Sequence, residues 1–577
     1  MHFPHAVFER FSREELSRSR RVAKLVVQVA ARTGIWSHTT PAGAKVMLEG
    51  LITQRTNPSL LYRFQARIQP DKTAILWRDQ KRSFRELDEE IDGIGNGLRA
   101  HGLGRGTRAV IMLKNRPELI ALQPAMSRMG AGGVSISWRS TPSELTYLVN
   151  HSGAQAMFFE HDLAQVVSQA LPSFESLRAN RMFSVGGSVE GFPSYDALIH
   201  EPASNSDAGD DDAAVIIYTS GTTGKPKGAV RKFPKDVVEG TLQIIAASPL
   251  RADDVHLGVL PFYHSTAYAF TNFSHLVGAT VVIMDRFEPE AFLAAIQEHR
   301  VTQTAIVPTL LHRVLQLGSD KIWQYDTGTL RAIMMAGAPL SGELAAAAMD
   351  VFGDVLYNYY GATETGLNTV AGPRDLRLSP GTIGRIIAGT EIRLLDEDGQ
   401  PVSRGEVGEL YVRGPMTVAG YHDDDAATQS SQLGGFFSVG DLAWIDERGC
   451  YHLAGRKRDM IISGGVNVYP AEVERVLEAH PQVADATVIG LTDKEWGERV
   501  CAVVVPVGDG GEAFLQSLKE HCREQLAGPK RPRQIEVVDV LPRNPTGKVL
   551  KRVLQERFDD STSALAPGAR ATYADPT

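Results

Sequence analysis

The chain has 577 residues, more than one hydrophobic core usually holds, so at least two domains are expected. Its 60 Lys and Arg against 68 Asp and Glu give a formal net charge of −8, which argues against nucleic acid as a partner. The cysteines are too few and too scattered for a disulfide framework or a zinc site: Cys450, Cys501 and Cys522. With no apolar run of 18 residues and no secretory signal, a cytoplasmic protein is expected.

Residues 1–50 are expected to form a helical appendage. Ser12 and Glu15 have the spacing of a capping box, and apolar side chains then recur at helical intervals. Lys and Arg outnumber Asp and Glu over residues 1–32. A basic amphipathic helix suits either peripheral contact with an anionic membrane or packing on its own globule with a solvated basic face.

From about residue 60, predicted strands alternate with predicted helices, which favours βαβ units and largely parallel sheets. Ser83 and Glu86 have capping-box spacing before a helix that runs through Leu98, and Thr141 begins another helix. The predicted strands of this part are 73–77, 109–113 and 156–159. Residues 201–212 are acidic and polar, as in a solvated linker.

Residues 213–218 form an apolar run that is typical of a buried strand, and the segment 218–228 follows it with glycines, hydroxyls and lysines. Glycines let a backbone approach a ligand closely, and Ser and Thr supply hydrogen-bond donors, so this loop suits a phosphate chain. It is not a Walker A loop, because Gly221 and Gly224 are too close and Pro226 follows the first lysine. A flexible surface turn is the alternative.

The same alternation continues to residue 360. The strands predicted here are 281–284, 305–308, 331–335 and 355–360, and the helices are 234–247, 289–299 and 341–352. Polar or glycine-rich loops follow several of these strands, at residues 336–339 and 361–366. Open α/β sheets bind ligands at such strand ends.

From residue 380 the strands become short and closely spaced, with hairpin signals such as Asp398-Gly399. Past residue 459 an independent α+β piece follows, and residues 558–577 have the composition of a flexible tail. The expected fold is therefore α/β: a large domain over 51–458, with mixed and parallel sheets, helices and a small β section, and then a small C-terminal domain over 459–557.

Five loop clusters occur in a fixed order along the chain: 218–228, 360–366, 440–441, 455–459 and 542–548. Together they resemble the adenylate-forming superfamily of acyl-CoA synthetases, and the long-chain fatty-acid–CoA ligases within it. The resemblance spans residues 55–555 and implies a two-step reaction. ATP and a carboxylic acid give an acyl-adenylate and pyrophosphate, and coenzyme A then displaces AMP. Mg²⁺ is the implied metal.

The resemblance assigns most nucleotide contacts. Glu364 would hold Mg²⁺, and Thr363 would donate to the α-phosphate. Tyr360 would stack on adenine, and Asp441 would accept the ribose hydroxyls, with Arg456 as a second ribose or phosphate contact. The remaining ATP contacts that the resemblance implies are Thr219, Ser220, Gly221, Thr222, Thr223, Gly224, Lys227, Gly337, Ala338 and Pro339.

Lys548 matches the lysine that bridges the carboxylate and the α-phosphate, and it would act with Glu364 and Thr363 in catalysis. Asp459 matches the hinge about which a mobile small domain turns. Gly464 and Gly465 match the segment that lines the pantetheine tunnel, where adjacent glycines suit close passage of a thin ligand.

The acyl pocket implied by the resemblance includes His264, Ser265, Met335, Gly361 and Leu367. Small and apolar side chains around these positions favour a hydrophobic acid, expected to be a medium- to long-chain fatty acid. Three alternatives stay open: an aryl-CoA ligase, an acyl-AMP ligase that delivers to a carrier protein, and, from another class, a non-catalytic nucleotide-binding protein.

Overall fold

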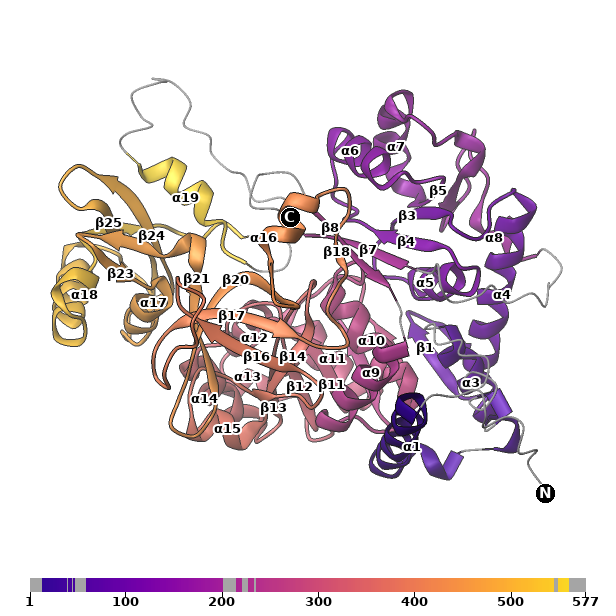
Figure 1. Ribbon diagram of the computed structural model, residues 1–577, viewed down its shortest axis with the longest axis horizontal. Coiled ribbons are helices and arrows are strands. Elements are labelled where there is room, and N and C mark those ends of the chain that lie inside the picture. Colours follow the sequence, from indigo (N-terminus) through magenta and orange to yellow (C-terminus); the bar gives the residue numbers. More distant parts are fainter. Residues whose placement is uncertain are drawn as a thin grey trace.

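The computed structural model of the protein describes residues 13–38, 40–43, 45–46, 59–200, 214–219, 227–232, 235–543 and 548–559 (Figure 1). The described strands form three sheets, two in a large N-terminal domain and one in a small C-terminal domain that lies at one side of the view. Among the described residues, none of the helices has the length and apolar content that a membrane crossing requires. The predicted linker, 201–212, and nearly all of the predicted tail lie outside the described residues.

The first sheet has the strand order β18-β8-β7-β4-β3-β5-β6. Its strands are Arg108–Met112 (β3), Gly132–Ser135 (β4), Ala156–Glu160 (β5), Met182–Val185 (β6), Ala214–Thr219 (β7), Lys227–Lys232 (β8) and Gly420–Tyr421 (β18). Strands β3 to β7 are parallel, and β8 and β18 continue the sheet antiparallel. Val110 and Ile111 enter two different hydrophobic clusters, because alternate residues face opposite sides of a strand. The sheet is therefore covered on both faces.

The second sheet has the order β16-β17-β20-β21-β15-β14-β13-β12-β11-β9-β10-β1-β2, with β19 paired to β20. Its strands are Thr73–Trp77 (β1), Gln80–Ser83 (β2), Val255–Gly258 (β9), Thr280–Ile283 (β10), Gln303–Ile306 (β11), Ala332–Met335 (β12), Leu356–Ala362 (β13), Gly366–Ala371 (β14), Thr382–Ile386 (β15), Glu391–Leu395 (β16), Gly408–Arg413 (β17), Gln432–Leu433 (β19), Phe436–Ile445 (β20) and Tyr451–Arg456 (β21). The closely spaced strands predicted after residue 380 are present. They continue this sheet, because β14 pairs with β15 at Thr369 and Ile386.

The helices of the large domain cover these two sheets. They are Arg13–Thr33 (α1), Ser59–Ile68 (α3), Phe84–Ala100 (α4), Pro117–Arg128 (α5), Pro142–Ser152 (α6), Ala164–Ala170 (α7), Tyr195–Leu198 (α8), Lys235–Ala247 (α9), Ser265–Val277 (α10), Pro289–His299 (α11), Pro308–Leu315 (α12), Ser319–Ile322 (α13), Gly342–Phe352 (α14), Pro373–Leu378 (α15) and Asp425–Ser430 (α16). The capping boxes predicted at Ser83 and Thr141 are both formed, so local chemistry sets these two helix starts.

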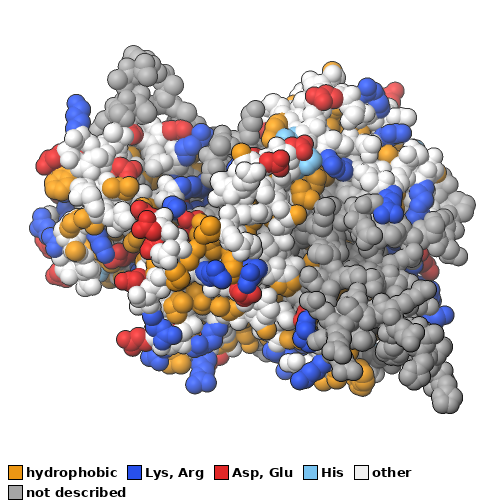
Figure 2. Space-filling view, in the orientation of Figure 1, with side chains coloured by type: hydrophobic (Ala, Val, Ile, Leu, Met, Phe, Trp, Pro, Cys, Tyr) orange, Lys and Arg blue, Asp and Glu red, His pale blue; other side chains and the backbone are white. Residues whose placement is uncertain are grey.

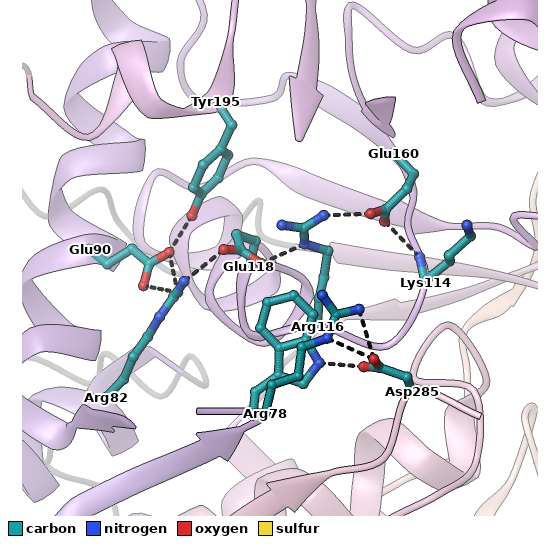
Figure 3. Close-up of polar contacts among 10 residues, drawn as sticks. Arg78, Arg82, Glu90, Lys114, Arg116, Glu118, Glu160, Tyr195 and Asp285 are labelled. Atoms are coloured by element: carbon teal, nitrogen blue, oxygen red, sulfur yellow. Dashed lines mark hydrogen bonds and ion pairs between the residues drawn. The ribbon is translucent and has the colours of Figure 1, made fainter. Parts of the chain in front are cut away.

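A buried network of charged groups ties the edge of the second sheet to the first sheet (Figure 3). Arg82 on β2 donates to Glu90 on α4 and to Glu118 on α5. Arg116 donates to Glu118 and, at 2.5 Å, to Glu160 on β5. The hydroxyl of Tyr195 completes the network with a 2.6 Å hydrogen bond to Glu90. Every charge is paired, which a buried charge needs if it is not to destabilise the fold.

The small domain has its own sheet and core. Its elements are Ile461–Ser463 (β22), Val466–Val468 (β23), Pro470–Glu478 (α17), Val483–Asp493 (β24), Gly497–Pro506 (β25), Glu512–Gln525 (α18), Gln534–Val537 (β26) and Lys551–Phe558 (α19). The predicted fold class, a large α/β domain followed by a small α+β domain, is confirmed. The boundaries at residues 51, 459 and 558 and the mobility of the small domain stay predictions.

The N-terminal helix α1 packs against α9 beside it (Figure 1). Its Val29 joins a hydrophobic cluster with Ile244 and Ile245, and Arg21 lies 3.6 Å from Glu239. Packing on its own globule, one of the two alternatives, therefore takes up apolar surface that a membrane contact would need. Ser12 and its capping box lie outside the described residues.

Candidate active site

The phosphate loop joins two neighbouring strands at the carboxyl end of the first sheet. Strands β7 and β8 pair antiparallel, with Tyr218 opposite Gly228 and Thr219 opposite Lys227. The predicted loop residues between them lie outside the described residues: Ser220, Gly221, Thr222, Thr223 and Gly224. The Lys227 amine lies 3.6 Å from the carboxylate of Asp424 and 5.2 Å from the centre of the Tyr421 ring.

The turn between β13 and β14 carries Thr363 and Glu364 at the carboxyl end of the second sheet. The Thr363 hydroxyl lies 3.2 Å from that of Ser265, the first residue of α10. Glu364 is 7% exposed, and its Oε1 accepts a hydrogen bond of 3.2 Å from the Tyr421 hydroxyl. Gly361 is required here, because a Cβ at this position would lie 2.0 Å from the carbonyl oxygen of Gly366.

Both carboxylate oxygens of Asp441 contact predicted site residues, Tyr360 and Arg456. The Tyr360 hydroxyl donates to Oδ2 at 2.8 Å, and the Nε of Arg456 lies 3.2 Å from Oδ1. Asp441 and Arg456 are direct partners across β20 and β21. Each carboxylate oxygen has two lone pairs, so both can still accept a ribose hydroxyl. Burial first, and then the charge of Asp441, raises the pKa of Tyr360, which keeps its hydroxyl a donor.

Residues 336–339, which follow β12, are the segment predicted to run along the adenine base. Gly337 has a φ of +89°, and Gly337 and Ala338 are half-buried whereas Pro339 is exposed. A Cβ on Gly337 would come within 3.9 Å of the Thr266 hydroxyl on α10. This segment is therefore open on one side, as the predicted contact with a base requires.

Lys548 reaches this site from the small domain. Burial and Arg456 lower its pKa, and the charges of Asp441 and Glu364 act in the opposite direction. The residue keeps solvent-accessible surface, so partial rather than complete desolvation is the cause. Lys548 thus lies within electrostatic range of Glu364, Asp441 and Arg456, which come from three other parts of the chain.

Two ion pairs hold the segment around Lys548 on the small domain. Arg543 donates two hydrogen bonds to Asp485 on β24, at 2.6 and 2.9 Å. The Lys551 amine donates to Glu474 on α17 at 2.8 Å. Neither pair was predicted, and neither carries a sequence signal, because the partners are 58 and 77 residues apart.

His264 lies at the start of α10, with its ring 4.1 Å from that of Tyr263. Its Nε2 is buried and has no hydrogen-bond partner among the described residues. Burial, and then the positive charges of Lys548 and Arg139, lower the pKa of His264 to about 4. A neutral ring of this kind fits a pocket wall and not a general base.

We expect His264 to stay neutral at every pH above about 5 and to add no inflection to a pH–rate profile in that range. Its folded pKa lies below 6.5, so the free energy of unfolding falls as pH falls from 6.5 towards 4. NMR of the histidine Cε1–H groups checks this, with the resonance assigned by its loss in His264→Gln. A midpoint near 6.5 for His264 would show that the ring is not desolvated.

The remaining predicted acyl-pocket residues do not share one environment. Met335 has no exposed surface, because it packs in the core cluster that contains Ile306 and Leu311. Its assignment to the acyl pocket stays a prediction, and the structure shows Met335 only as a buried core residue. Gly361 and Leu367 keep partial exposure.

The predicted hinge and tunnel residues follow the last strand of the large domain. Asp459 ends a short 3-10 helix, Lys457–Asp459, between β21 and β22. Gly464 and Gly465 form the tip of the β22–β23 hairpin, with φ values of +58° and +77°. The backbone N–H of Gly464 donates to the carbonyl oxygen of Trp496 at 2.8 Å, within the small domain.

The residues of the candidate site fit a Mg²⁺ ion that binds as part of a metal–nucleotide complex. No group of three or more His, Cys, Asp or Glu side chains in the described part of the chain could hold a metal by itself. Glu364 would thus be the main protein ligand, and phosphate oxygens and water would complete the shell, which is the usual arrangement for Mg²⁺.

Nucleotide-dependent acid activation is the class of chemistry that this site defines. The model of the AMP-binding enzyme family matches residues 62–422, and that of the AMP-binding enzyme C-terminal domain matches residues 472–548. The chain belongs to the AMP-binding enzyme family, so the expected membership of the adenylate-forming superfamily is confirmed.

Three relatives illustrate the family. Feruloyl-CoA synthase from Amycolatopsis sp. is 33% identical over 86% of this chain and 97% of its own. The anthranilate CoA ligase AuaEII, solved with anthranoyl-AMP, has a TM-score of 0.81 at 25% identity, over 88% of this chain and 98% of its own. O-succinylbenzoate coenzyme A synthetase from Bacillus subtilis, solved with ATP and magnesium, has a TM-score of 0.73 at 28% identity, over 85% and 98%. None of these names is that of a fatty-acid ligase, so they do not support the expected fatty-acid family.

Proposed function

We propose that the protein is an ATP-dependent, AMP-forming acid–CoA ligase that activates an aromatic carboxylic acid. The observation that carries the first half is the match of the two AMP-binding enzyme models to residues 62–422 and 472–548. The charges of Glu364, Asp441 and Arg456, which act on the Lys548 amine, agree with it. The acids in the names of the similar proteins, ferulic, anthranilic and o-succinylbenzoic acid, support the second half. The aryl-acid alternative thus replaces the fatty-acid expectation.

In the first half-reaction, a carboxylate oxygen attacks the α-phosphorus of ATP and pyrophosphate leaves. A carboxylate is a weak nucleophile and both reactants are anionic, so the site must align them and offset charge. Asp441 would fix the ribose, and Thr363 would donate to the α-phosphate. Lys548 would place its positive charge between the two reacting groups. Mg²⁺, when bound at Glu364, supplies charge neutralisation for the phosphates.

In the second half-reaction, a thiol sulfur attacks the acyl carbonyl and AMP leaves. We propose that the small domain turns about Asp459, and that the hairpin tip at Gly464 and Gly465 then lines the path of the pantetheine arm. Hinge motions of this kind are absorbed by a few residues between domains. Coenzyme A is the acceptor that the names of the relatives support.

An aromatic acid also suits the side chains around His264. The neutral imidazole and the adjacent Tyr263 ring offer flat, largely apolar surfaces, and aromatic rings pack well against such surfaces.

A panel of acids separates the candidate functions. Pyrophosphate release would be measured with ferulate, anthranilate, o-succinylbenzoate and fatty acids of 8 to 18 carbons, with and without coenzyme A. We expect the highest kcat/KM with one of the aromatic acids, and the matching thioester as product. A fatty acid as the best substrate would restore the earlier expectation. Pyrophosphate release without any thioester would favour an acyl-AMP ligase, and no release with any acid would favour a non-catalytic nucleotide-binding protein.

A further inference from the structure

Tyr421 links the carboxylate of Glu364 to the strand that leaves the phosphate loop. Its hydroxyl donates to Glu364 Oε1 at 3.2 Å, although the two residues are 57 positions apart in the sequence. Tyr421 lies on the two-residue strand β18, where it pairs with Ala229 of β8. The Tyr421 side chain therefore contacts Glu364, the candidate metal ligand, and the Tyr421 backbone pairs with the strand that begins at Lys227.

The position of Tyr421 is fixed from several directions. Its backbone N–H donates to the Thr428 hydroxyl at 2.9 Å, and its ring packs edge-on against Phe437. The Lys227 amine lies over the ring and is paired with Asp424, which itself caps helix α16.

A hydrogen bond to one oxygen restricts the rotation of a carboxylate about χ3. The direction in which Glu364 offers its electron pairs to a cation is then set by the protein and not by free rotation about χ3. Because Tyr421 pairs with β8, the same contact also ties this carboxylate to the strand that begins at Lys227.

We propose that Tyr421 is a positioning residue that orients Glu364 towards the divalent cation accompanying the nucleotide, and that β18 keeps this carboxylate in register with strand β8. The inference rests on the proposed function, because it assumes that a nucleotide and its cation bind at this site. Removal of a partner that orients a metal ligand typically lowers metal affinity or activity by about 10- to 100-fold.

Tyr421→Phe tests the proposal, because it deletes the hydroxyl and keeps the ring that contacts Lys227 and Phe437. The probe is Mn²⁺ with ATP and no acid, so that no turnover occurs. The enhancement of water-proton relaxation by protein-bound Mn²⁺, which is absent for free Mn²⁺ and for MnATP in solution, reports formation of the ternary complex. We expect the variant to need about 10- to 100-fold more Mn²⁺ than the wild-type protein. ATP binding measured in EDTA should be unchanged.

Tyr195→Phe is the matched control. It also removes a tyrosine hydroxyl that donates to a glutamate, Glu90, but in the buried network of Figure 3, which contains none of the candidate site residues. This variant should bind Mn²⁺ with wild-type affinity. In turnover assays, Tyr421→Phe should raise the Mg²⁺ concentration needed for pyrophosphate release and leave thioester formation from preformed acyl-AMP unaltered, since no phosphate chain leaves in that step.

The outcomes separate the inference from the proposed function. Absence of a ternary complex with Mn²⁺ and ATP in the wild-type protein would overturn both. Equal Mn²⁺ affinity in the wild-type protein and Tyr421→Phe would overturn the inference alone. Loss of ATP binding in EDTA by Tyr421→Phe would also overturn it, because the hydroxyl would then support the fold of the site and not the carboxylate.

Discussion

Lys548→Ala is expected to slow pyrophosphate release by about 10²- to 10³-fold, the cost of removing one group that stabilises a transition-state charge. The same variant should convert preformed acyl-AMP to the thioester at the wild-type rate, because the charge of Lys548 is needed only while the phosphate bond breaks. Rapid-quench measurement of each half-reaction checks both statements.

Lys519→Ala supplies the control for this experiment, since Lys519 is an exposed lysine on α18 of the same domain. It should leave both half-reactions intact. The lowered pKa of Lys548 adds a pH test: the charged form is lost as pH rises, so pyrophosphate release should fall on the alkaline side. Equal losses in the two half-reactions of Lys548→Ala would refute the assigned role.

Gly464→Ala is expected to slow the thioester half-reaction while adenylation continues. The new Cβ would lie 2.5 Å from Cε3 of Trp496, and the φ of +58° disfavours any side chain. Placing an L-residue in this region costs about 1–2 kcal/mol, and 1.4 kcal/mol corresponds to about a tenfold change in rate. Single-turnover transfer from acyl-AMP to coenzyme A measures the effect.

Gly465→Ala is the matched control, because Gly465 has a φ of +77° and nothing within 4 Å of its ideal Cβ. Gly465→Ala introduces the same backbone strain but no steric clash with Trp496. Its thioester half-reaction should therefore be slowed less than that of Gly464→Ala. A slower adenylation step with normal transfer to coenzyme A in Gly464→Ala would contradict the proposed place of this hairpin.

Local chemistry made much of the fold predictable. The strand at residues 73–77 and the helix at 289–299 have the bounds that their sequences indicate, and the capping boxes at Ser83 and Thr141 are formed. What could not be predicted are pairings between distant segments. Residues 420–421 pair with β8, some 190 positions earlier, and no short-range pattern marks so short a strand.

In the candidate site, too, residues in local motifs could be predicted and residues placed by distant contacts could not. Glu364, Asp441, Arg456 and Lys548 follow recognisable local motifs, and the charges of the first three act on the Lys548 amine. Tyr421 and the ion pairs of Arg543 and Lys551 depend on tertiary contacts alone. Strand alternation at β12 buried Met335 in the core. Small apolar residues suit either a ring or an acyl chain, so composition could not choose between aromatic and fatty acids.

The two ion pairs beside Lys548 have a consequence for the order of events. Both partners, Asp485 and Glu474, belong to the small domain, so Arg543 and Lys551 are tied to that domain on either side of Lys548. The proposed rotation about Asp459 would therefore move Lys548 with the small domain, away from the newly formed acyl-adenylate. Such a coupling would make the two half-reactions mutually exclusive in time. It would also slow the reverse reaction. Pyrophosphate that rebinds after the rotation would attack the acyl-adenylate without the Lys548 charge that stabilises the transition state.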